Sequence, residues 1–346
     1  MAKKFFLSLL LLVAGITHLL SPNLFVNALP DFLIFKKQII YLSGFFEIAL
    51  SLGLLAKKYQ YVFAEITANY FIFLIPIHIY VAMNGIEMFH ISSKTLLWMR
   101  LILQYPLILC AFSLTKNPWV IEQLWRNVLF IHYKIDPKTI EHLVPFKLDL
   151  FEGQAVLSIV PFYMDKIRFP YLPAIPKVSS LWELNLRTYV EVDGVKGIYF
   201  FTLETDSKIG EILANKLFFL PYRYSKIEAK IKDGQYYFNH QREKIKFEMR
   251  AVLSKNETSK SLFDLWATER YSLFTKYKNT IFRGIVMHDP WNLFEVEVNL
   301  NKNNLLSMIN LEHFKVENSQ YSDRLLVRFK PFLKKVSEYE NSIAKT

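Results

Sequence analysis

The sequence predicts a membrane four-helix bundle followed by an α+β domain built on a curved, mostly antiparallel sheet. Three features of the 346 residues lead to this fold class. The first third contains four apolar stretches of 16 to 23 residues and few charges. The remainder carries many charges of both signs, and its apolar residues recur mostly at every second position. The single cysteine, Cys110, excludes a disulfide within the chain and any paired-cysteine metal or redox site.

Each apolar stretch is close to the length that crosses a hydrocarbon core of about 30 Å. The four stretches cover residues 5–20, 39–55, 61–83 and 96–114. A signal peptide is a poor alternative for the first, because three more spans follow it. We therefore expect residues 1–115 to form a transmembrane domain whose partner is the lipid bilayer, and residues 116–346 to form a soluble domain.

Lysines in the short loops predict the orientation of these spans. Five fall on one side, namely Lys3, Lys4, Lys57, Lys58 and Lys116, and three on the other, namely Lys36, Lys37 and Lys94. Positive loops favour the cytoplasmic side. The sequence thus predicts a multi-pass protein of the cell (inner) membrane whose N-terminus and second domain are both cytoplasmic.

Few polar residues interrupt the spans, and His18, Glu47 and His78 are the notable ones. A carboxylate in hydrocarbon is costly and normally faces the bundle interior. Glu47 lies mid-span, where it is either a packing group or a site for proton or quinone handling. His18 lies at a span end, where an interfacial or capping role is expected.

The stretches AGITHLLSPNLF, LSGFFEIALSLGLL and NYFIFLIPIHIYVAM resemble the DoxX-like membrane proteins. The shared pattern is Gly-x-x-His ending the first span and Gly-x-x-Glu in the second, here Gly15 with His18 and Gly44 with Glu47. Relatives are four-helix proteins, some of them associated with thiosulfate and quinone oxidation. The resemblance therefore implies quinone as a candidate partner of the bundle.

Strand and helix signals alternate in the second domain. Asp193-Gly194 and Asp233-Gly234 predict hairpin turns, and a further turn is expected at Gln241-Arg242. Helices are predicted at 136–145, 206–218 and 261–277, the last with Ser261 as N-cap. The strands between them predict an antiparallel sheet that is closed or strongly curved.

Six stretches of this domain resemble the YqjF-like family, domain of unknown function 2071. They are WRNVLFIHYKIDPKTIEHLVP, VPFYMDKIRFPYLP, WELNLRTYVEVDGVKGIYFFTLE, LFFLPYRYSKI, TERYSLF and HDPWNL, in that order over about residues 120–313. The family is similar in fold to acetoacetate decarboxylase, whose curved sheet surrounds an interior pocket. The resemblance implies that pocket but no established activity.

The segment LFFLPYRYSKI resembles the part of acetoacetate decarboxylases in which paired lysines follow a proline and one forms a Schiff base. Here Tyr222 and Arg223 follow Pro221, and neither forms a Schiff base. By strand alternation, Tyr222, Tyr224 and Lys226 share one face. Lys226 is thus either a displaced amine nucleophile or a lysine at the rim or in solvent, and the second is favoured.

Other polar parts of such a pocket have counterparts here. Lys134 stands where the decarboxylases place an arginine, and Glu183 resembles their pocket glutamate. The resemblance implies a buried ion pair between Lys134 and Glu183, since a buried carboxylate needs a partner or a proton. Glu183, Asn185, Arg187 and Tyr189 share one strand face, which is either exposed or lines the pocket. Arg187 can bind a carboxylate or phosphate through two hydrogen bonds.

Several function classes lack support in the sequence. Gly-rich phosphate loops, HExxH and nucleophile-elbow motifs do not occur, and no metal or cofactor is predicted. Lys and Arg are scattered, so nucleic acid is not an expected partner. We expect the cytoplasmic domain to bind a small anionic or carbonyl-bearing molecule through Lys134, Glu183, Asn185, Arg187, Tyr222 and Arg223. Two alternatives stay open: an acid–base enzyme acting through Glu183 and Tyr222, and a quinone-linked redox accessory acting through the bundle.

Overall fold

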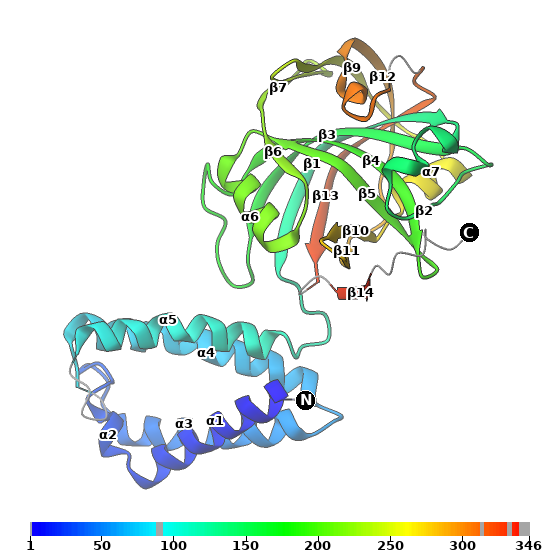
Figure 1. Ribbon diagram of the computed structural model, residues 1–346. Coiled ribbons are helices and arrows are strands. Elements are labelled where there is room, and N and C mark those ends of the chain that lie inside the picture. The colour runs from blue at the N-terminus through cyan, green and yellow to red at the C-terminus, as the bar shows by residue number, and fades with distance from the viewer. Residues whose placement is uncertain (1, 88–92, 312–314, 331–333, 339–346) are drawn as a thin grey trace. The chain divides into compact units, whose positions relative to one another are not determined.

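The computed structural model describes residues 2–87, 93–311, 315–330 and 334–338. The chain divides into two compact units, Met1–Pro118 and Trp119–Thr346, here called the helical unit and the sheet unit. Figure 1 shows helices alone in the first and mostly strands in the second.

The helical unit contains four helices that are long and apolar enough to cross a membrane. They contain the four predicted apolar stretches except residues 113 and 114, so the prediction of four candidate spans is confirmed. A one-turn helix, α2, follows the first of them. The bounds are α1 Ala2–Leu20, α2 Asn23–Val26, α3 Lys36–Leu55, α4 Gln60–Asn84 and α5 Lys94–Phe112.

Two glycines let α1 and α3 approach closely. A Cβ atom at Gly15 would lie 2.7 Å from the carbonyl oxygen of Gly44, and one at Gly44 would lie 2.9 Å from that of Gly15. Small residues at a crossing are the usual means by which apolar helices pack in a membrane. Farther along the same contact, Ser51 Oγ donates to the Ser8 carbonyl oxygen at 2.8 Å. The contact therefore combines close backbone packing with a hydrogen bond between the two helices.

The sheet unit is built on a closed ring of strands. Neighbours in the ring are β1, β3, β4, β5, β10, β11 and β13, and β13 pairs with both β1 and β11 to close it. All of these pairs are antiparallel except β5 with β10. From β13 the sheet continues through β12, β9, β8 and β7. The predicted curved, mostly antiparallel sheet is confirmed.

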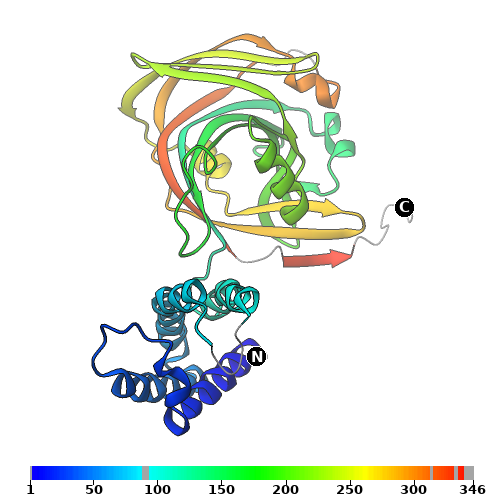
Figure 2. The same ribbon diagram turned by 90° about the vertical axis from the view of Figure 1, so that its left-hand side faces the viewer.

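The bounds of the strands are β1 Ile121–Ile135, β2 Lys147–Leu148, β3 Ala155–Arg168, β4 Leu181–Val192, β5 Val195–Thr205, β6 Tyr222–Tyr224, β7 Lys226–Lys232, β8 Gln235–Arg242, β9 Ile245–Glu257, β10 Ser272–Tyr277, β11 Thr280–Met287, β12 Phe294–Asn303, β13 Asn318–Phe329 and β14 Lys334–Glu338. The helices of this unit are α6 Lys208–Phe218 and α7 Leu262–Thr268, with 3-10 turns at Pro137–Thr139, Glu141–Leu143 and Leu305–Ile309. Figure 2 shows α6 lying across the curved sheet.

Ring strands bury both faces, because alternate side chains enter two different cores. On β1, Val128 and Phe130 join a core inside the ring. Leu129 and Ile131 join a second core, shared with Phe238 and other residues of the β7–β8–β9–β12 extension. This double burial explains why these strands read as nearly continuous apolar runs.

Three local predictions are corrected by the structure. The helix expected at 261–277 is α7 only, because residues 272–277 pair as β10 with β11 and β5. Ser261 does cap α7, in a capping box with Asp264. The helix expected at 136–145 is two 3-10 turns, and the turn expected at Gln241-Arg242 lies at residues 243–244.

Candidate functional site

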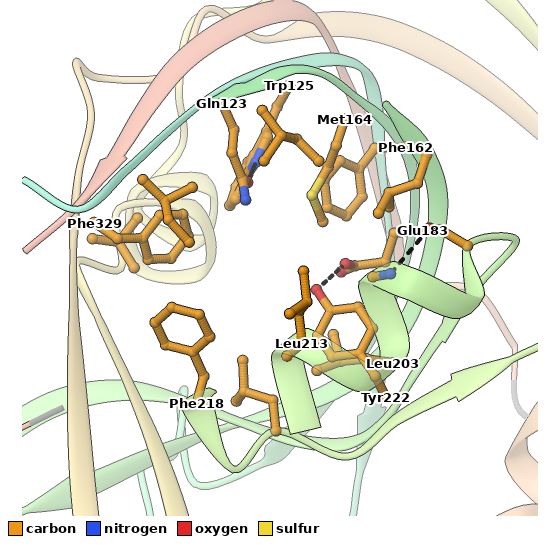
Figure 3. A pocket seen from close by; sticks show the side chains of 18 of the residues that line it. Gln123, Trp125, Phe162, Met164, Glu183, Leu203, Leu213, Phe218, Tyr222 and Phe329 are labelled. Carbon is orange, nitrogen blue, oxygen red and sulfur yellow. Dashed lines mark hydrogen bonds between the residues drawn. The ribbon is translucent and has the colours of Figure 1, made fainter. Parts of the chain in front are cut away.

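A cavity of about 520 Å³ lies within the ring of the sheet unit, and every ring strand contributes to its lining. Its volume falls in the range typical of small-molecule sites, about 300–1,000 Å³. Most lining side chains are apolar, such as Trp125, Phe162, Met164, Leu203 and Phe329 (Figure 3). The polar lining residues are Gln123, Arg168, Ser179, Glu183, Asn185, Arg187, Ser207, Tyr222 and Lys330.

Glu183 of β4 is the buried carboxyl group of this cavity, and only 2% of it is exposed. Tyr222 Oη donates to its Oε2 at 2.5 Å (Figure 3). Asn185 Nδ2 donates to its Oε1 at 3.0 Å. Burial raises the pKa of Glu183 to about 7, although the hydrogen bonds from Tyr222 and Asn185 and the charge of Arg187 oppose the rise. Both protonation states are therefore accessible near neutral pH.

Tyr222 is aimed at Glu183 by a local clamp between α6 and β6. Asn215 of α6 accepts a hydrogen bond from the Tyr222 backbone N–H at 2.9 Å and donates to its carbonyl oxygen at 3.0 Å. Strand β6 pairs in parallel with β5, and this pairing fixes the direction of β6. Burial and the neighbouring carboxylate raise the pKa of Tyr222 well above its usual value. The phenol therefore stays protonated and acts as a donor.

Arg187 and Asn185 bring unsatisfied polar atoms to the cavity. Arg187 is 7% exposed and Asn185 is 3% exposed. Arg187 Nε and Asn185 Oδ1 have no hydrogen-bond partner. In the described part of the chain Arg187 forms no ion pair, and its guanidinium lies 5.3 Å from the ring centre of Phe130. A buried cation without a carboxylate partner is costly unless a ligand supplies one.

A hydrogen-bonded chain beside Arg187 was not predicted from the sequence. His132 Nδ1 lies 2.7 Å from Ser158 Oγ, which lies 2.8 Å from Tyr189 Oη. His132 Nε2 lies 2.8 Å from Gln320 Oε1. Burial, helped by the charge of Arg187, lowers the pKa of His132 to about 3, so the imidazole is neutral. The sequence signal for His132 was its position two residues after Phe130, which places both side chains on one strand face. Many histidines of protein cores show the same pattern, so it does not mark a site.

Two of the predicted contacts lie outside the cavity. Lys134 is beyond His132 on β1, where its Nζ lies over Phe151 and 3.8 Å from Glu152 Oε2. The predicted ion pair between Lys134 and Glu183 is therefore wrong. Arg223 is exposed and does not line the cavity, since alternation along β6 sends it away from the side that Tyr222 faces.

Lys226 also lies outside the cavity. Its side chain is 73% exposed and its Nζ lies 2.8 Å from Glu228 Oε1. The expected alternation from Tyr222 ends at Ser225, because β6 stops at Tyr224 and β7 pairs with β8 instead. Lys226 therefore fits the solvent-exposed alternative.

The glycine crossing in the helical unit brings His18 and Glu47 together. His18 Nδ1 lies 2.9 Å from Glu47 Oε2, and Tyr70 Oη donates to Glu47 Oε1 at 2.9 Å. His78 on α4 is also buried. Among the residues with described positions, no group of three or more His, Cys, Asp or Glu side chains could hold a metal ion.

Two of the solved structures that are similar to this chain are an acetoacetate decarboxylase and an acetoacetate decarboxylase-like enzyme. The chain is similar to acetoacetate decarboxylase from Legionella pneumophila, with 12% identity and a TM-score of 0.47 over 65% of this chain and 91% of that one. It is similar to an acetoacetate decarboxylase-like enzyme from Sphingomonas wittichii RW1, with 11% identity and a TM-score of 0.46 over 63% of this chain and 94% of that one.

Sequence comparison finds a matching family model for each unit. Residues 7–115 match DUF8561, a domain of unknown function, so the DoxX-like resemblance of the helical unit stays a prediction. The chain is 35% identical over 199 residues to the uncharacterized protein YqjF of Bacillus subtilis (strain 168), covering 55% of this chain and 82% of YqjF. Residues 122–326 match DUF2071, described as an uncharacterized conserved protein. The chain therefore belongs to the DUF2071 family.

Proposed function

We propose that the sheet unit binds a molecule with a carboxylate or similar anionic group and an apolar body. The observation that carries this proposal is the buried Arg187 guanidinium, which faces the cavity and forms no ion pair among the described residues. A ligand carboxylate beside it would accept charge-assisted hydrogen bonds. The mainly aliphatic and aromatic walls then favour an apolar remainder over a small polar one.

Glu183 sets the charge of the site. When protonated, it leaves Arg187 as the charge facing an anionic ligand. When ionised, it repels that ligand. Because the pKa of Glu183 is about 7, anion binding should weaken as pH rises through neutrality. Asn185 Oδ1, the other unsatisfied atom, can accept a hydrogen bond from a ligand hydroxyl or protonated group.

A titration of the full chain with straight-chain carboxylates from butyrate to octanoate tests this proposal. Affinity should rise about fourfold with each added methylene, since burying one contributes about 0.8 kcal/mol. The alcohols of the same length should bind at least tenfold more weakly, because a charge-assisted hydrogen bond contributes about 1.5–3 kcal/mol.

Matched arginine variants provide the control. Arg187→Met should remove the preference for carboxylate over alcohol. Arg126→Met should keep it, because Arg126 pairs with Asp165 and does not line the cavity. Equal binding of carboxylates and alcohols by the unaltered chain would overturn the proposal.

Acid–base chemistry on a carbonyl compound is a second candidate for the same site. It is favoured by the 2.5 Å contact between Tyr222 and Glu183 and by the raised pKa of Glu183, which suits proton transfer near pH 7. Deuterium exchange at the methyl group of pyruvate, followed by NMR in D₂O, tests it. Exchange should be lost in Glu183→Gln and should persist in Glu228→Gln, an exposed carboxylate on β7.

For the helical unit we propose a DoxX-like membrane bundle that leaves the N-terminus and the sheet unit on the cytoplasmic side of the cell membrane. The excess of lysines in the loops assigned to that side supports the orientation. In a Cys110→Ser background, an impermeant maleimide added to intact cells should label Lys94→Cys and spare Lys57→Cys. The opposite labelling would reverse the orientation.

Quinone handling is the further candidate for this unit. The direct contact of His18 with Glu47 supports it, since such a pair can pass a proton. Binding of a short-chain quinone to the full chain should then be lost in Glu47→Gln and kept in Glu65→Gln. Equal binding by both variants would contradict it.

A further inference from the structure

The cavity of the sheet unit is bordered by apolar side chains that are also exposed. They come from the connection between β3 and β4 and from α6, and they are Leu172, Ile175, Val178, Ile209 and Leu213, here called the rim. Ile175 is 59% exposed and Ile209 is 58% exposed. Ile212, also on α6, is 50% exposed. Contiguous exposed apolar groups around a cavity mark a surface that meets something apolar.

The exposed apolar side chains of α6 lie on one face of the helix. Ile209, Ile212 and Leu213 follow the spacing of one helix face. The helix is anchored on its inner side, where Gly210 packs against Leu181 and Asn215 is hydrogen-bonded to Tyr222. It therefore holds these three exposed side chains in a fixed position beside the cavity, where Ile209 and Leu213 also line it.

Charges around the rim favour an anionic partner. Residues 166–178 contain Lys166, Arg168 and Lys177 and no acidic residue. Lys166 and Lys177 are exposed, as are Lys208 and Lys216 of α6, and these four lysines outnumber the nearby acidic residues of the α6 segment, Asp206 and Glu211. Apolar side chains flanked by exposed lysines are the combination that binds the headgroup region of anionic membranes.

If α5 spans a bilayer, the short connection between α5 and β1 keeps this cavity near its surface. Residues 113–120 alone join α5 to β1, and the first residue of β1, Ile121, lines the cavity. Eight residues reach at most ~28 Å when fully extended. A tether of that length keeps the membrane surface at a high effective concentration.

The polar groups of β4 lie deeper in the cavity than the rim. Leu181 contacts α6, and β4 then carries Glu183, Asn185 and Arg187 successively farther from that contact. At about 3.3 Å per residue, Arg187 lies ~20 Å along the strand from Leu181. An amphiphile bound at Arg187 would therefore direct its apolar end toward the rim.

We propose that the rim docks on the surface of an anionic lipid bilayer, so that the cavity exchanges its ligand with the lipid phase. Docking is inferred from the exposed apolar side chains of the rim and the lysines around it. Exchange of a carboxylate amphiphile rests on the proposed function. A second copy of the chain is the competing occupant of the rim, and the lysines around it argue against self-association because they would face one another.

Depth-dependent quenching in vesicles tests docking with the full chain. In the Cys110→Ser background, a bimane label is placed at Ile212→Cys or, as matched control, at Val252→Cys, an exposed aliphatic position on β9 outside the cavity. With vesicles of phosphatidylcholine and phosphatidylglycerol, brominated acyl chains should quench the label at 212 at least twofold and leave that at 252 unchanged. Quenching should fall when phosphatidylglycerol is omitted and in Lys177→Glu/Lys208→Glu.

Equal fluorescence of the two labels with and without brominated lipid would overturn docking. A disulfide-linked dimer of Ile212→Cys without lipid quenching would also overturn it, in favour of a second copy. The proposed function fails separately. If the carboxylate titration shows no dependence on Arg187 while quenching at 212 remains in Arg187→Met, docking stands and the ligand assignment falls.

Discussion

Glu183 gives the sharpest quantitative prediction, because its burial links protonation to folding. The pKa of this carboxyl is about 7 in the folded chain, against a usual value of 4.5. At ~1.36 kcal/mol for each factor of ten in proton affinity, this difference corresponds to about 3 kcal/mol. The folded state binds the proton more tightly than the unfolded state does. This stabilisation is therefore complete below pH 4.5 and is lost as pH rises through about 7.

Replacement of Glu183 by glutamine should remove that pH dependence. Glutamine resembles the protonated carboxyl, so the variant should match the unaltered chain near pH 5 and be about 2–3 kcal/mol more stable at pH 8. His132 titrates in the opposite sense, because its lowered pKa makes the folded chain more stable as pH rises toward 6.5. That contribution is common to both proteins and cancels in the difference.

Urea unfolding from pH 5 to 8, followed by tryptophan fluorescence, measures this difference. Five of the six tryptophans lie after residue 118, so the signal reports mainly on the sheet unit. Glu228→Gln, which changes an exposed carboxylate, serves as the control and should follow the unaltered chain. Parallel curves for Glu183→Gln and the unaltered chain across this range would refute the reasoning.

Three further perturbations have clear expected outcomes. Gly44→Val should separate α1 from α3 and lower the thermal midpoint in detergent by several degrees, measured by loss of helical circular dichroism, whereas Leu42→Val on the exposed side should not. Glu204→Gln should lower the free energy of unfolding by about 3–5 kcal/mol in urea at pH 7, because it leaves buried polar partners, including Arg242, without their carboxylate. Borohydride treatment with pyruvate should add no mass to the chain, and an adduct on Lys226 would contradict its exposed placement.

Acidification should reveal the contribution of Glu204 to stability, at lower pH than the contribution of Glu183. Burial alone would raise the pKa of this carboxyl, but hydrogen bonds from His240, Arg242 and Thr202 outweigh burial and lower it to about 2. Its stabilisation is present above pH 4.5 and is lost as pH falls toward 2. Urea midpoints of the unaltered chain should therefore fall between pH 4.5 and 3, and those of Glu204→Gln should fall less.

The spacing of apolar residues in the sequence was sufficient to predict the architecture of both units. The four apolar stretches and the period-two segments depend on local pattern, and so do the turns at Asp193-Gly194 and Asp233-Gly234, where the structure has positive φ angles. The helix predicted at 261–277 failed because residues 272–277 suit either state locally. Their pairing with β5 and β11, contributed by distant parts of the chain, decided the outcome.

The site was predictable only where one strand determined it. Glu183, Asn185 and Arg187 alternate on β4, so their shared face followed from spacing. The position of Lys134 depended on how far along β1 the cavity extends, which spacing does not specify. The contacts of His132 with Ser158 and Gln320 join three strands, and their register could not be derived from any one of them.

Closure of the ring by β13 has a consequence for how the chain is made. Strand β1 emerges from the ribosome early, yet Leu129 pairs with Tyr321, about 190 residues later. Contacts of such wide sequence separation form slowly. During synthesis the edge of β1 that later accepts β13 is an open hydrogen-bonding template, at risk of pairing with other chains. Premature termination before residue 318 therefore leaves a nascent chain prone to aggregation, so completion of β13 decides whether synthesis yields a closed ring.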